Sequence, residues 1–152
     1  MNEKNIKVKN VISECGADRL LPPALMYIFY IILHGHLSPG GGFQGGVLSV
    51  AVVVLLYLGH GYETTANAIS LGFMHKFEGF ASIVYVALAM LGVAYGANFC
   101  MNVFAHAGGI GDLVSSGTIA MMNVTVGVKV FAGVAVVALT MLGLIAMDRE
   151  KE

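Results

Sequence analysis

The chain has 152 residues, of which 57% are apolar and 11% charged, and its mean hydropathy is +0.81. Because a water-soluble domain carries about 25% charged residues, this composition excludes an ordinary soluble domain, a disordered chain and a coiled coil. Eight Lys and Arg against nine Asp and Glu give a net charge of -1, which excludes a basic surface for nucleic acid. The composition as a whole leaves an all-α integral membrane protein as the expected class.

The expected elements are four membrane-spanning helices in a single domain. Residues 1–19 alternate charged and isolated apolar residues and lack the pattern of a signal peptide, so we expect a polar leader that stays with the protein. A helix needs roughly 20 apolar residues to cross about 30 Å of hydrocarbon. Four runs approach this length, at residues 20–38, 43–59, 79–101 and 117–147, followed by a polar tail at 148–152.

The positive charges predict the orientation of these helices. Every Lys and Arg except Lys129 lies before the first run, in the 60–78 connection or after the last run. Because short loops rich in Lys and Arg stay in the cytoplasm, both termini are predicted to be cytoplasmic. The sequence shows no inverted repeat of the kind that builds complete transporters, so we expect one subunit of a larger membrane assembly.

The segment from His34 to Gly46 breaks the helical pattern between the first two runs. Its six glycines and one proline cannot continue a helix, so they predict a tight hairpin near membrane depth. Irregular backbone at that depth must be buried in protein or line a wet cavity. The predicted motif consists of His36, Pro39, Gly40, Gly41, Gly42, Phe43, Gln44, Gly45 and Gly46.

The third run carries a face of small or polar residues. Glu78 opens this run and is expected near its cytoplasmic end, where the free N–H groups of a helix N-terminus stabilise a carboxylate. Ser82, Tyr85, Ala89, Gly92 and Gly96 follow at helical spacing, which favours close packing against another helix.

Lys129 lies about twelve residues into the fourth run, too deep to reach either interface easily. An ammonium at that depth costs about 3 kcal/mol or more unless it meets water or a partner, so we expect it to face protein or a hydrated cavity. It could exchange protons, act as a fixed positive barrier, or form a structural ion pair with a neighbouring subunit. A direct pair with Glu78 is not expected, since the two residues are predicted at different depths.

The histidines offer weaker candidates for chemistry. His34 could relay protons, because histidine exchanges them near neutral pH, or it could satisfy the glycine-rich backbone by hydrogen bonding. An HxH pair can bind metal, but no cysteine lies nearby and His106 and Asp112 are distant in sequence. We therefore predict no metal, no cofactor and no catalytic centre, and a small intramembrane enzyme is the least favoured function.

The His34–Gly46 segment, followed far downstream by residues 117–119 and 123–130, resembles the B subunit of Mrp-type multisubunit sodium/proton antiporters. Similar B-type subunits occur in energy-converting membrane-bound hydrogenases and sulfur-reducing complexes. The resemblance covers residues 19–146, including Glu78 and the four runs.

The resemblance implies an accessory subunit of a sodium/proton antiporter module in a prokaryotic cytoplasmic membrane. Its partners would be other membrane subunits, the lipid bilayer and the transported Na+ and H+. The alternative that it leaves open is a structural adaptor in a ferredoxin-linked, ion-pumping complex. Lys129, Glu78 and His34 are the candidates for an ion path or relay that match the family pattern.

Overall fold

The computed structural model describes residues 3–37, 41–105, 109 and 116–149, and the side chains between residues 11 and 145 within these ranges. Four of its helices are long and apolar enough to cross a membrane, and the described residues contain no strand. The expected all-α membrane architecture, with a break between the first two long helices, is thereby confirmed. The helices are α1 (Glu3–Leu33), α2 (Gly42–His60), α3 (Tyr62–Ala68), α4 (Leu71–Ala94) and α5 (Thr118–Arg149).

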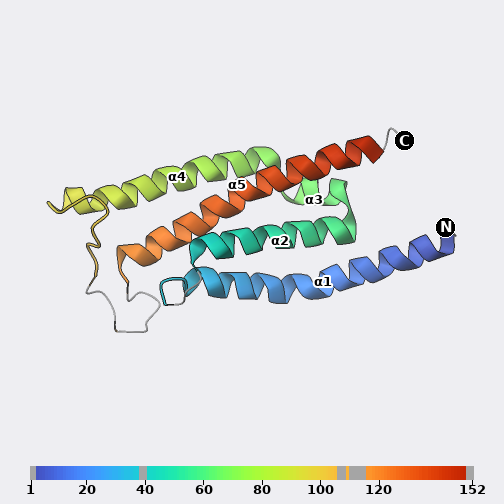
Figure 1. Ribbon diagram of the computed structural model, residues 1–152, viewed down its shortest axis with the longest axis horizontal. Coiled ribbons are helices and arrows are strands. Elements are labelled where there is room, and N and C mark those ends of the chain that lie inside the picture. Colours follow the sequence, from blue (N-terminus) through green and yellow to red (C-terminus); the bar gives the residue numbers. More distant parts are fainter. Residues whose placement is uncertain (1–2, 38–40, 106–108, 110–115, 150–152) are drawn as a thin grey trace.

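The four long helices lie in the spatial order α1, α2, α5, α4 (Figure 1). Helix α2 packs against both α1 and α5, and α5 also packs against α4. The start of α1 and the end of α5 lie at one end of the bundle, whereas the turn between α1 and α2 lies at the other (Figure 1). The chain thus runs along the bundle four times in alternating directions and returns to the end at which α1 begins.

The buried core of this bundle is small. Eleven of the described apolar residues are buried. The cluster that joins α2, α4 and α5 consists of Val50, Met74, Ala132 and Ala135. In the apolar windows of the four long helices, between 11% and 33% of the residues are buried within the chain. Most apolar side chains therefore face outward, where lipid or another membrane protein must cover them.

Helix α4 begins at Leu71, eight residues before the expected start at 79, and ends at Ala94 rather than 101. The side chain of Ser70 caps its start, since the hydroxyl oxygen accepts a hydrogen bond of 3.3 Å from the backbone N–H of Phe73. The sequence-based boundary is wrong because it treated the charged residues between 75 and 78 as loop. Glu78 consequently lies two turns inside α4 and not at its head.

The end of α4 is fixed by Gly96, which has a φ of +73°. The backbone N–H of Gly96 donates to the Val93 carbonyl, and that of Ala97 donates to the Gly92 carbonyl, both at 2.9 Å. These two bonds form the Schellman motif that ends many helices. The chain then folds back, so residues 98–101 cover Gly92, and this part of the expected helix-packing face contacts the chain's own loop.

Two further differences concern the ends of the expected spans. Helix α1 starts at Glu3, so the predicted leader is largely helical and continuous with the first span. The expected 60–78 connection contains the short helix α3, which no periodic pattern predicted. Both segments lie at the end of the bundle where α5 ends (Figure 1).

Candidate functional site

The glycine-rich hairpin is held by the side chain of Asn123 on α5. The Asn123 Nδ2 group donates a 2.9 Å hydrogen bond to the Ile32 carbonyl, and its Oδ1 accepts a 2.6 Å bond from the Gly42 N–H. The Ile32 carbonyl belongs to the last turn of α1 and the Gly42 N–H to the first turn of α2, where backbone groups have no partner within the helix. One carboxamide therefore closes both helix ends.

The glycines of the motif are needed because backbones meet here. A Cβ on Gly42 would collide with the Asn123 carbonyl oxygen, and one on Gly35 would collide with the Asn123 amide. One turn further along α2, a Cβ on Gly46 would lie 2.7 Å from the Gly127 carbonyl oxygen. The glycines thus allow α2 and α5 to approach at backbone distance, as small residues do between membrane helices.

The other hairpin residues are placed as follows. His34 is partly exposed beyond the end of α1, where its ring stacks on Tyr30 at 4.3 Å and its Nδ1 lies 3.1 Å from the Tyr30 carbonyl oxygen. His36 is also partly exposed, and Phe43 and Gln44 are exposed in the first turn of α2. Pro39 and Gly40, like His106 and Asp112, lie outside the described residues.

Glu78 and Lys129 line one groove on the outer face of the bundle, with a volume of about 470 Å³. The two residues were expected at different depths, yet they line the same groove, because α4 starts at Leu71 and carries Glu78 within its length. The Glu78 carboxylate packs against Gly133, which lies one turn beyond Lys129 on α5. A Cβ added at Gly133 would lie 3.4 Å from Glu78 Oε1. The rest of the groove is lined by Phe43, Val130, Gly133, Val134 and Val137.

The two charges in this groove are close but not in contact. Among the described ion pairs, none within 4.0 Å joins Glu78 to Lys129. Lys129 is exposed in the isolated chain, whereas Glu78 is partly buried. A carboxylate accepts hydrogen bonds and can hold a cation or a proton, while an ammonium only donates. The groove therefore combines one group that attracts a cation with one that repels it.

Four hydroxyl groups within the spans are satisfied by their own helices. Ser49, Ser82, Thr125 and Thr140 each donate to the carbonyl four residues earlier, at 2.7–2.9 Å. Such bonds are the common way to satisfy a hydroxyl in a membrane helix. The Asn123 amide instead bonds across helices, to α1 and α2.

Two further polar contacts join residues that are distant in the sequence. Asn102 caps the start of α5, because its Oδ1 accepts from the N–H and the hydroxyl of Thr118 at 3.0 and 2.8 Å. His60, at the end of α2, lies 3.3 Å from Asp18 on α1 through its Nε2 atom. Neither pair has a local signal, since the partners are separated by 16 and 42 residues.

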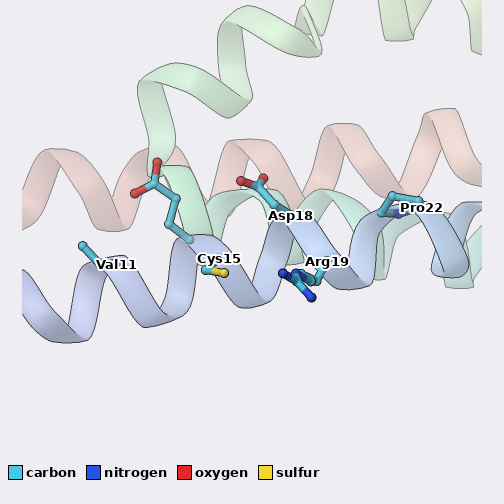
Figure 2. A pocket seen from close by; sticks show the side chains of 6 residues that line it. Val11, Cys15, Asp18, Arg19 and Pro22 are labelled. Carbon is cyan, nitrogen blue, oxygen red and sulfur yellow. The ribbon is translucent and has the colours of Figure 1, made fainter.

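A second groove, of about 460 Å³, runs along α1 beside this pair. Figure 2 shows Asp18 and Arg19 projecting from α1 in different directions, with Cys15 one turn earlier. Across the described part of the chain, no three His, Cys, Asp or Glu side chains are grouped to hold a metal ion. The groove is lined by Val11, Glu14, Cys15, Asp18, Arg19 and Pro22.

Replacing Asn123 by alanine is expected to lower the thermal stability of the protein. The substitution leaves the Ile32 carbonyl and the Gly42 N–H without their partner, and each unsatisfied buried group costs about 1–3 kcal/mol. The midpoint of thermal unfolding in detergent, monitored by size-exclusion chromatography of the heated protein, measures the loss of stability. Asn98→Ala is the matched control, because Asn98 is exposed, and equal midpoints for the two variants would contradict the assigned role of Asn123.

Comparison with known families and proteins gives a consistent result. The family described as a domain related to the MnhB subunit of Na+/H+ antiporters matches residues 12–136. The B-type subunit of a Na+/H+ antiporter from Bacillus subtilis is 28% identical over 106 residues, covering 70% of this chain and 72% of that protein. Its counterpart from Alkalihalophilus pseudofirmus is 26% identical over 103 residues, covering 68% and 71%.

Two archaeal proteins are also similar. An uncharacterized protein of Methanocaldococcus jannaschii is 32% identical over 117 residues, which cover 70% of this chain but 42% of that relative. A chain of the membrane-bound sulfane sulfur reductase, an archaeal respiratory membrane complex, superposes with a TM-score of 0.70 at 30% identity. The superposition covers 86% of this chain and 57% of the reductase chain, so this protein corresponds to part of both archaeal relatives.

Proposed function

We infer the function of this chain from one premise: it belongs to the family of domains related to the MnhB subunit of Na+/H+ antiporters. It is a multi-pass membrane protein with four apolar helices. Its proposed function is that of an accessory membrane subunit in a multisubunit cation/proton antiporter, contributing to the ion path or to its assembly. Na+ and H+ are the proposed transported ions.

One observation supports this proposal above the others. A carboxylate and an ammonium, Glu78 and Lys129, line an open groove on the side of a four-helix row whose core is small. Intramembrane charges are costly and usually mark ion pathways or partner contacts. A complete path needs walls on every side, so the groove fits a chain that supplies one wall.

The proposed ion-path candidates are Lys129, Glu78 and His34. The first two share the groove, whereas His34 lies at the α1–α2 hairpin, toward the opposite face of the membrane from the chain ends. The glycine-rich motif and Asn123 then hold the hairpin that carries His34. This division of roles is part of the proposal.

We place the chain in a prokaryotic cytoplasmic membrane with both ends in the cytoplasm. Helix α1 has 31 residues, which at 1.5 Å per residue extend about 46 Å, beyond the ~30 Å hydrocarbon core. Its N-terminal part therefore projects from the bilayer, and Lys4, Lys7 and Lys9 mark that side as cytoplasmic.

A second candidate function is that of a structural adaptor in a redox-driven, ion-pumping complex. The superposition on a chain of an archaeal respiratory membrane complex favours it. In this setting the same four helices would join membrane subunits, and the energy would come from electron transfer, with ferredoxin as the proposed donor.

The test is deletion of the gene and complementation with an affinity-tagged copy. We expect the tagged chain to co-purify with several membrane subunits, and everted vesicles from the deletion strain to lose Na+/H+ antiport. A chain that purifies alone, or vesicles that keep full antiport after deletion, would contradict the proposal. Subunits of a hydrogenase or sulfur reductase among the co-purifying proteins would favour the adaptor function.

A further inference from the structure

Lys129 lies in the groove between α4 and α5, at a depth from which its ammonium cannot reach water at either end of the helix. Lys129 lies eleven residues from Thr118 and sixteen from Ile145, the ends of the apolar segment of α5. At 1.5 Å per residue these separations are about 16 and 24 Å, more than a lysine side chain can span by snorkelling. Lys129 is nevertheless exposed.

Glu78 does not supply the missing counter-charge by contact. Its carboxylate packs over Gly133, and no described ion pair within 4.0 Å joins it to Lys129. The remaining groove side chains are hydrocarbon, from Phe43, Val130, Val134 and Val137. The groove therefore offers the ammonium no contacting acceptor from these side chains, and the compensating group must come from outside the chain.

The apolar rim of the groove indicates which kind of molecule supplies the counter-charge for Lys129. Phe43 is 63% exposed and Val137 is 58% exposed, so apolar side chains surround the charged centre. Lipid tails would cover the rim but bring no hydrogen-bond acceptor to Lys129. A membrane helix covers an apolar rim and satisfies its own backbone at this depth, and one acidic side chain on it would meet the ammonium.

We propose that this groove is the docking site of a transmembrane helix from a different subunit, which places an Asp or Glu carboxylate against Lys129. The inference rests on the proposed function, since it requires a multisubunit complex. Charge complementarity fixes the centre of the contact, and Phe43, Val134 and Val137 pack against apolar side chains on either side. A buried pair of this kind also sets which helix fits, because an uncharged helix leaves Lys129 without a partner.

The test is chemical cross-linking in the purified complex. Dicyclohexylcarbodiimide enters the membrane and activates a carboxyl group, and an adjacent amine then displaces the urea to form an amide. We expect mass spectrometry to find Lys129 joined to an Asp or Glu in a transmembrane helix of another subunit. Lys129→Arg is the matched control, since it keeps the positive charge but should lose the amide.

A second measurement uses the photoreactive residue benzoylphenylalanine at Val134 and, separately, at Val137. Both positions should form an adduct with the helix identified by the carbodiimide. A link from Lys129 to Glu78 of the same chain or of a second copy, or photo-adducts confined to lipid and detergent, would overturn the inference. So would the lack of any adduct in both experiments. The proposed function fails separately, if the chain does not co-purify with other subunits.

Discussion

Replacing Gly42 by alanine is expected to prevent the chain from folding stably into its complex. The new Cβ would collide with the carbonyl oxygen of Asn123 and lie 2.8 Å from the backbone nitrogen of Gly127. Both obstacles are backbone atoms of α5, so no side chain can rotate to make room. Helix α2 would have to move away from α5, and the hydrogen bond from the Gly42 N–H to Asn123 would weaken or break.

The expected loss is large compared with the stability of a typical protein. Overpacking costs about 1–3 kcal/mol or more, and a broken buried hydrogen bond adds about 1–3 kcal/mol, against a total of about 5–15 kcal/mol. The yield of assembled complex and its thermal midpoint in detergent measure the effect. We expect little assembled complex at growth temperature.

The matched control is Gly72→Ala, also in the first turn of a long helix. A Cβ at Gly72 meets nothing within 4 Å, and alanine favours the helix over glycine by up to about 1 kcal/mol. Gly72→Ala should therefore leave assembly unchanged or raise the midpoint slightly. If Gly42→Ala behaves like this control, the close contact between α2 and α5 does not exist in the complex.

The sequence predicts the architecture because the membrane leaves few choices. Apolar runs of the required length can only be helices, and a stretch as rich in glycine as residues 34–46 cannot continue them. The hairpin was therefore predictable, but its hydrogen bonds to Asn123 were not. Asn123 is 81 residues from Gly42, and no local pattern links the two.

The location of Glu78 shows why the site was predicted less well than the fold. A span predicted as a run of uncharged residues stops at the first charged residue. Helix propensity and a cap at Ser70 nevertheless extend α4 further toward its N-terminus. The same criterion separated Glu78 from Lys129, which the structure brings into one groove. Whether a charged residue lies inside a membrane helix depends on its tertiary and quaternary partners. Hydropathy along the chain therefore cannot show which charged residues do so.

Lys129→Met is expected to reduce cation/proton exchange about tenfold or more while the complex still assembles. Methionine has nearly the length of lysine and fills the groove without the charge. Placing an ammonium at this depth costs about 3 kcal/mol or more, so removing it changes the electrostatic energy of the proposed path by more than the ~1.4 kcal/mol that corresponds to a tenfold change in rate. The proposed partner carboxylate can bind a proton when the ammonium is removed, since an isolated buried charge neutralises itself. Assembly should therefore survive, whereas the charge pattern along the path does not.

Antiport in everted vesicles, normalised to the amount of complex, is the appropriate measurement, and Lys129→Arg is the control that keeps the positive charge. Arginine should retain a larger share of exchange than methionine, because the guanidinium remains charged. Reduced exchange with normal assembly in Lys129→Met assigns the lysine to the ion path. Normal exchange in that variant would contradict this role and leave the lysine as a purely structural charge in an adaptor subunit.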